Sequence, residues 1–155
     1  MQSKIFTNVI DALKVVPKNS KTVFTNGCFD IIHLGHLEYL KKSRNLGDYL
    51  IIGLNSDESI RNLKGNNRPF NDFQYRSEFL SYLDFVDMVI EFSESTPLDL
   101  IKTLNPHILT KGSDYKIDEV VGHDHVKSYG GDVVLINLKA GNSTSNIIKK
   151  IKSKY

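Results

Sequence analysis

Five short runs of apolar, largely β-branched residues recur along the chain, with little polar alternation inside them. Such runs are typical of strands that are buried on both faces, as in a parallel sheet. We therefore predict strands at Thr22–Thr25, Tyr49–Asn55, Val86–Phe92, His107–Thr110 and Asp132–Leu138.

Helical spacing of apolar residues fills the intervals between these runs. An opening helix is expected around Phe6–Val15, before Pro17, and a short one at His125–Tyr129. The alternation of strand and helix predicts an α/β fold: a Rossmann-like, doubly wound, mainly parallel five-stranded sheet with helices on both faces. We expect a single domain over residues 1–155, with residues 1–20 as an N-terminal helical extension. The clearest helical patterns are His36–Asn45, Phe73–Leu83, Leu98–Leu104 and Ser143–Lys152.

Composition narrows the classes of function. A chain of 155 residues with 40% hydrophobic and 25% charged residues has the size and make-up of one globular domain. A formal charge of +2 is too small to indicate a nucleic-acid binder. The chain has neither an apolar run near the roughly 20 residues of a membrane span nor a secretory signal, and Cys28 is its only cysteine. We expect a cytoplasmic protein that binds neither membrane nor nucleic acid.

The segment Thr25–His36, with the sequence TNGCFDIIHLGH, lies where a buried strand ends and a helix begins. Gly27 and Gly35 allow a ligand to approach the backbone closely. His33 and His36 are spaced to face one side of the first helical turn, beside a helix N-terminus that attracts anions. Phosphoryl transfer needs such donors around the attacked phosphorus, so the segment predicts a phosphate site.

A second polar element, Gly141–Ile148 with the sequence GNSTSNII, follows the last predicted strand. Its hydroxyl residues Ser143, Thr144 and Ser145 are suited to cap a helix and also to bind a phosphate. Because both elements follow parallel strands, we expect them to meet at one carboxyl edge of the sheet. His33 and His36 should then face Thr144 and Ser145 across one cleft, with Lys64 and Lys111 at its rim.

The pattern GxFDxxHxGH, matched in full by Gly27 to His36, resembles the hallmark of the HxGH nucleotidyltransferase superfamily. Five further segments in order make the chain similar, over nearly Thr22–Lys152, to heptose-1-phosphate adenylyltransferases, which occur alone or as the C-terminal half of a bifunctional heptose kinase–adenylyltransferase. The resemblance implies ATP and D-glycero-β-D-manno-heptose 1-phosphate as substrates, with Mg²⁺ carried on ATP, and it is compatible with a homodimer. The segments are LNSDESIRNLKG, RPFND, the helix of Arg76, LTKGSDY and NSTSNIIKKI.

The resemblance also assigns roles to individual residues. Those at the reacting phosphates are His33, His36, Lys64 and Arg76. Those expected to bind the sugar substrate are Asn55, Asp57 and Asp114. Those expected to bind the nucleotide are Asn26, Gly27, Cys28, Phe29, Asp30, Gly35, Lys111, Gly112, Asn142, Ser143, Thr144 and Ser145.

Several of these residues also have a plainer reading. Lys64, beside Gly65 and Arg68 in the polar stretch Lys64–Asn71, also fits an exposed loop lysine. Arg76 is equally a member of a surface ion pair, and Asp57 a helix cap. His123 and His125, on either side of Asp124, have the alternating spacing of two metal ligands in an extended segment. No third ligand is apparent, so we expect no metal site.

Three other functions remain open on the sequence. Cytidylyl transfer to glycerol 3-phosphate keeps the same motifs, but that family typically has Thr at Cys28 and an Arg-Thr pair at Leu138 and Lys139. Phosphopantetheine and flavin adenylyltransferases commonly place a proline after Asp30, which this chain lacks. A nucleotide-binding sensor without turnover is the alternative of another class.

Overall fold

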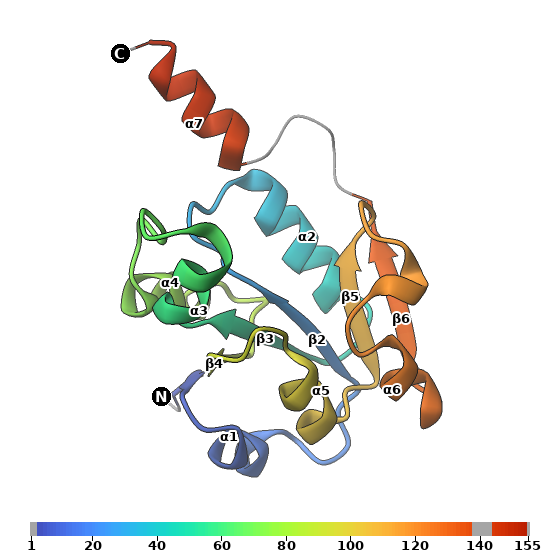
Figure 1. The fold of residues 1–155 in the computed structure, drawn as a ribbon. Coiled ribbons are helices and arrows are strands. Elements are labelled where there is room, and N and C mark those ends of the chain that lie inside the picture. Colours follow the sequence, from blue (N-terminus) through green and yellow to red (C-terminus); the bar gives the residue numbers. More distant parts are fainter. Residues whose placement is uncertain (1–2, 138–143, 155) are drawn as a thin grey trace.

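The structure, a computed structural model, describes residues 3–137 and 144–154. A single six-stranded sheet forms its centre, in the order β1-β4-β3-β2-β5-β6, and every neighbouring pair of strands is parallel. Helices lie on both faces, which confirms the predicted doubly wound α/β class (Figure 1). The strands are β1 (Ile5–Phe6), β2 (Thr22–Gly27), β3 (Tyr49–Asn55), β4 (Met88–Phe92), β5 (Ile108–Gly112) and β6 (Asp132–Ile136).

Most predicted helices are found within a few residues of their expected ends. The last one begins at Thr144 in the described part of the chain, so the expected start at Ser143 lies outside the described residues. The helices are α1 (Val9–Val15), α2 (Leu34–Arg44), α3 (Asp57–Lys64), α4 (Phe73–Ser81), α5 (Leu98–Leu104), the 3₁₀ turn η1 (Ile117–Glu119), α6 (His123–Ser128) and α7 (Thr144–Lys152).

The prediction of five strands and of a helical N-terminus was wrong in one place. Ile5 and Phe6 form a sixth strand, β1, which pairs with Val89 and Ile90 of β4. The helix begins only at Val9, because the side chain of Asn8 caps it by accepting the backbone N–H groups of Ile10 and Asp11. A strand of two residues carries no periodicity of its own, and only its distant partner β4 makes it a strand.

Helix α3 was not among the predicted helices, although Asp57 was considered as a helix cap. Ser56 caps it, with its hydroxyl accepting the backbone N–H of Ser59, so Asp57 is the first helical residue and not the cap. Lys64 consequently ends a helix instead of lying in a loop, and Gly65 follows it with a φ of 93° that favours glycine. The polar loop is therefore shorter than the sequence suggested.

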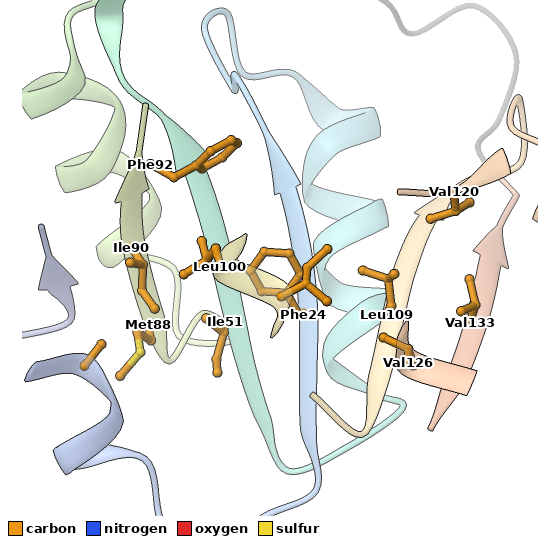
Figure 2. Close-up of a cluster of buried hydrophobic side chains, with 12 residues drawn as sticks. Phe24, Ile51, Met88, Ile90, Phe92, Leu100, Leu109, Val120, Val126 and Val133 are labelled. Carbon is orange, nitrogen blue, oxygen red and sulfur yellow. The ribbon is translucent and has the colours of Figure 1, made fainter. Parts of the chain in front are cut away.

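Two apolar clusters hold the helices to the sheet, one on each face. The cluster drawn in Figure 2 fills the face covered by α1, α5 and α6. The other cluster lies under α2 and α4, and includes Leu40 and Leu80 from these helices. Because both faces are buried, the strands carry apolar side chains on either side, as their sequence pattern indicated.

Parallel pairing places all the strand ends that precede a helix at one edge of the sheet. β2 lies between β3 and β5, with Phe24 opposite Ile51 on one side and Leu109 on the other. Gly27 and Gly112, the last residues of β2 and β5, therefore both lie at this edge. Ligands bind at this edge in sheets of this kind.

Candidate active site

A cleft of about 310 Å³ opens at the carboxyl ends of β2 and β5. It combines backbone, aromatic, cationic and imidazole groups from both halves of the chain. Among the residues that the structure describes, its lining consists of Asn26, Gly27, Cys28, Phe29, Asp30, His33, Gly35, His36, Tyr39, Lys64, Arg68, Lys111, Gly112, Asp114, Tyr115 and Thr144.

The loop between β2 and α2 forms the floor of the cleft and turns sharply after Gly27. Phe29 adopts a left-handed φ of 45°, and its ring packs so closely that a Cβ on residue 27 would lie 3.0 Å from it. Gly27 thus gives the ring its space. The turn delivers His33 to the N-cap position of α2 and His36 to its first turn.

The two histidines stack at this helix start. Their ring centroids are 3.9 Å apart, and the backbone N–H of His33 donates to Nδ1 of His36 at 3.4 Å. The neutral ring of His36 therefore carries its proton on Nε2, where it is a donor. Burial, and then the charges of His33 and Lys64, lower the pKa of His36 to about 4, and burial also lowers the pKa of His33. Both rings are thus predominantly neutral at pH 7.

The second polar element reaches the same cleft from the far end of the chain. Thr144, the first residue of α7, lines the cleft, and its hydroxyl donates to the carbonyl of Ile31 at 3.3 Å. Ser145 is exposed and is not part of the lining. Asn142 and Ser143 lie outside the described residues, as do Leu138 and Lys139. Of the second motif, the structure thus brings Thr144, but not Ser145, into the same cleft as His33 and His36.

Lys111 comes from β5 and is largely buried beside the cleft. Its ammonium donates to the carbonyl of Asn26 at 3.4 Å and lies 5.4 Å from the ring centroid of Tyr115. Burial lowers the pKa of Lys111, while the nearby Asp114 and Cys28 act in the opposite direction. The contact with Asn26 thus holds the lysine against the loop of the first motif. Lys64 lines the cleft from the end of α3.

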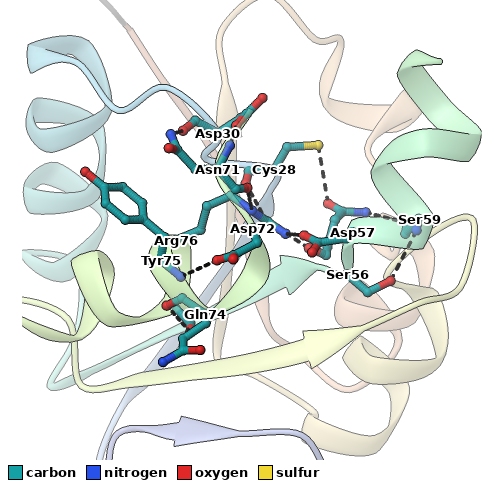
Figure 3. A network of polar contacts seen from close by, with 12 residues as sticks. Cys28, Asp30, Ser56, Asp57, Ser59, Asn71, Asp72, Gln74, Tyr75 and Arg76 are labelled. Carbon is teal, nitrogen blue, oxygen red and sulfur yellow. Dashed lines mark hydrogen bonds and ion pairs between the residues drawn. The ribbon is translucent and has the colours of Figure 1, made fainter. Parts of the chain in front are cut away.

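The structure does not bring Arg76 into the cleft. Its side chain is fully buried beneath the motif loop. The guanidinium donates to the carbonyls of Asn71 (3.0 Å), Cys28 (2.8 Å) and Asn55 (2.9 Å), and forms an ion pair with Asp57 at 2.6 Å (Figure 3). All three nitrogens of the guanidinium have a protein partner. This geometry fits a structural role in which Arg76 ties three loop segments together.

Asn55 and Asp57, expected at the sugar substrate, belong to this same buried network. The side-chain amide of Asn55 donates to the hydroxyl of Ser59 at 2.9 Å, and the thiol of Cys28 is 3.8 Å from its oxygen. Neither Asn55 nor Asp57 lines the cleft. Asp114, the third residue of that set, does line it.

Asp30 anchors the loop that follows α3. Its carboxylate accepts the backbone N–H groups of Phe70 and Asn71 at 2.9 to 3.0 Å and pairs with Nε of Arg68 at 2.8 Å. Asn71 in turn donates its side-chain amide to the carbonyl of Asp30 at 2.6 Å. With two backbone N–H donors and the cation of Arg68 around it, Asp30 is a structural acceptor and is not free to act as a base.

A family model described as cytidylyltransferase-like matches residues 24–150. The chain belongs to this family. The match covers both polar motifs and the cleft between them, and the chain is a nucleotidyltransferase, as the resemblance from its sequence implied.

The cytidylyltransferase-like chain is also similar to curated bacterial proteins called bifunctional protein HldE. It is 55% identical to that of Syntrophotalea carbinolica over 94% of its length and 52% identical to that of Helicobacter hepaticus over 97%. The chain spans only 30% of the length of each of these relatives. The similarity therefore concerns one part of a longer protein.

Solved structures share the fold of this cytidylyltransferase-like domain. A lipopolysaccharide core biosynthesis protein from Thermoplasma volcanium is 32% identical, with a TM-score of 0.64, over 80% of this chain and 100% of that one. A pantoate-beta-alanine ligase from Francisella tularensis gives a TM-score of 0.64 at 16% identity, over 92% of this chain and 69% of that one, and shows the fold alone.

Three residues of the cleft were not among the predicted site residues: Tyr39, Arg68 and Tyr115. Tyr39 is three residues after His36 on α2, a spacing that places both on one helix face, and Tyr115 directly follows Asp114. These spacings were available in the sequence. Arg68 opens the segment RPFND, but the sequence did not show that its side chain reaches the cleft, where the contact with Asp30 holds it.

Within the described residues, no three side chains of the His, Cys, Asp and Glu types are grouped as metal ligands. His123 contacts Asp124, whereas His125 contacts Asn105. Among the helices described, none is long and apolar enough to cross a bilayer.

Proposed function

We propose that this nucleotidyltransferase transfers AMP from ATP to a sugar 1-phosphate, D-glycero-β-D-manno-heptose 1-phosphate, with ADP-heptose and pyrophosphate as products. The observation that carries the proposal is the single cleft that unites His33, His36 and Thr144 with Lys64 and Lys111. The choice of substrate is supported by the heptose-1-phosphate adenylyltransferase motifs along the chain and by the similarity to a lipopolysaccharide core biosynthesis protein.

The reaction is a single in-line displacement. An oxygen of the sugar phosphate attacks the α-phosphorus of ATP, the bond from that phosphorus to the bridging oxygen breaks, and pyrophosphate leaves. The attacking phosphate is already ionised at pH 7, so no strong base is required. This agrees with a cleft whose carboxylate at Asp30 is occupied by N–H donors.

The chain contributes donors that meet the negative charge of the transition state. His36 offers Nε2–H beside the N-terminus of α2, whose free backbone N–H groups attract the same oxygens. Lys64 and Lys111 add positive charge at the two sides of the cleft. Mg²⁺ belongs to the substrate here, bound to the oxygens of ATP.

A substrate matrix tests the proposal. Pyrophosphate release is measured for ATP, CTP, GTP and UTP, each combined with heptose 1-phosphate anomers and with glycerol 3-phosphate. We expect the highest kcat/KM for ATP with the β-anomer of the heptose 1-phosphate. A higher value for CTP with glycerol 3-phosphate contradicts the proposal and favours the cytidylyltransferase alternative, whereas ATP binding without turnover on any acceptor favours a sensor.

A further inference from the structure

Arg68 lies in the cleft but has no part in the reaction as described above. It follows α3 in the loop that Asp30 anchors, and its side chain is 17% exposed. Its exposed part lines the same cleft as His33 and His36. The ion pair with Asp30 does not by itself explain why the side chain of Arg68 reaches the cleft.

The guanidinium is held from one side only. Nε faces the carboxylate of Asp30 at 2.8 Å, and the carbon Cζ lies 4.8 Å from the ring centroid of Phe70. In the described part of the chain, the two terminal nitrogens of Arg68 make no hydrogen bond. The contact of Nε with Asp30 is an ion pair without hydrogen-bond geometry. A guanidinium has five N–H donors in a planar fork, and the four on the terminal nitrogens remain for a ligand.

Asp30 fixes where this fork lies. Its carboxylate is only 1% exposed and also holds the backbone N–H groups of Phe70 and Asn71, on the C-terminal side of Arg68. Both the side chain and the loop are thus tied to the motif that carries the histidines. The fork is preorganised, which reduces the entropy lost when it binds a ligand.

The surroundings point to a phosphate as that ligand. The cleft gathers Arg68 with Lys64, Lys111 and the N-terminus of α2, and a planar fork binds two oxygens of a phosphate at once. We propose that Arg68 binds a phosphoryl group of the substrates through its terminal nitrogens and that Asp30 positions it. This rests on the proposed function, which brings two such groups into the cleft, the triphosphate of the nucleotide and the phosphate of the acceptor.

A purely structural role for Arg68 would consist of neutralising the buried carboxylate of Asp30. The two roles separate in a double-mutant cycle with Asp30→Asn, which removes that charge. If Arg68 only neutralises Asp30, Arg68→Ala changes no substrate affinity once Asp30→Asn is present. If Arg68 binds phosphate, the loss of affinity persists in the double variant.

The experiment compares Arg68→Ala and Arg68→Lys with the matched control Arg61→Ala, an exposed arginine of α3 outside the cleft. ATP affinity is measured by calorimetry without acceptor, and the KM values of ATP and acceptor by pyrophosphate release. We expect Arg68→Ala to weaken one of the two ligands by about 10- to 100-fold, as loss of a charge-assisted pair does. Arg68→Lys should lose about tenfold, because an ammonium does not serve Asp30 and a phosphate together.

The ligand whose affinity falls in Arg68→Ala shows which phosphate Arg68 binds. Weaker ATP binding assigns Arg68 to the triphosphate, and a rise confined to the KM of the acceptor assigns it to the acceptor phosphate. Unchanged affinity for both ligands in folded Arg68→Ala or Arg68→Lys, checked by circular dichroism, overturns the proposal. If the wild-type chain turns over no acceptor, the proposed function fails and ATP affinity alone decides the role of Arg68, with an unchanged value again overturning it.

Discussion

The imidazole rings of His33 and His36 are stacked at the start of α2, with their planes inclined by 27°. Burial lowers the pKa of both rings, and at His36 the charge of the neighbouring His33 lowers it further. Without a ligand, both rings are therefore predominantly neutral at pH 7, and each neutral ring keeps one N–H donor. Two neutral rings attract a phosphate less strongly than two imidazolium ions would. The start of α2, however, fixes the orientation of both rings.

Replacing either histidine should remove a preorganised donor. We expect His33→Ala and His36→Ala each to lower the rate of pyrophosphate release by about 10²-fold or more, while the fold is kept. His123→Ala, on α6 and outside the cleft, serves as the control and should keep its activity. Near-normal turnover in either folded cleft variant would show that its histidine has no such role.

The lowered pKa of His36 makes stability depend on pH. Between about pH 6.5 and about pH 4 the unfolded chain binds a proton at residue 36 that the folded chain does not. The free energy of unfolding should therefore fall as the pH is lowered through this window, and the penalty should be absent above it.

Urea unfolding at pH 7.5 and pH 4.5 measures this dependence. His36→Asn cannot titrate, so the difference between the two pH values should be smaller in that variant than in the wild type. An equal difference in both proteins would mean that His36 titrates normally in the folded state.

Arg76 should matter for stability before it matters for chemistry. We expect Arg76→Ala to lower the free energy of unfolding by about 3–5 kcal/mol, because the loss of a buried cation leaves its carbonyl partners and Asp57 unsatisfied. Urea unfolding measures the change, with exposed Arg61→Ala as the control. Full stability combined with lost turnover would instead support the direct role at the phosphates that the sequence resemblance implies.

The chain should prefer adenine to cytosine as the base of the nucleotide. We expect kcat/KM for ATP to exceed that for CTP by at least roughly tenfold, a difference of about 1.4 kcal/mol in transition-state binding. Steady-state pyrophosphate release with a fixed acceptor gives both values. Equal use of the two nucleotides would shift the assignment towards cytidylyl transfer.

The sequence alone determined the motifs and most of the elements, with β1 and α3 as the exceptions. Buried parallel strands are read from runs such as Tyr49–Asn55, and the first motif from the spacing of His33 and His36, because both are local patterns. Parallel topology then requires the segments after β2 and β6 to open onto one edge. The cleft with Thr144 follows from that rule without any coordinates.

Only the tertiary structure decided the contacts between segments distant in the chain. Strand β1 exists because Ile5 meets Val89, and Arg76 is buried because Cys28 and Asn55 offer it carbonyls. An arginine in a helix looks the same in sequence whether it faces a ligand, the solvent or three loop carbonyls. Its role depends on desolvation and on the partners that surround it, which arise when the chain packs.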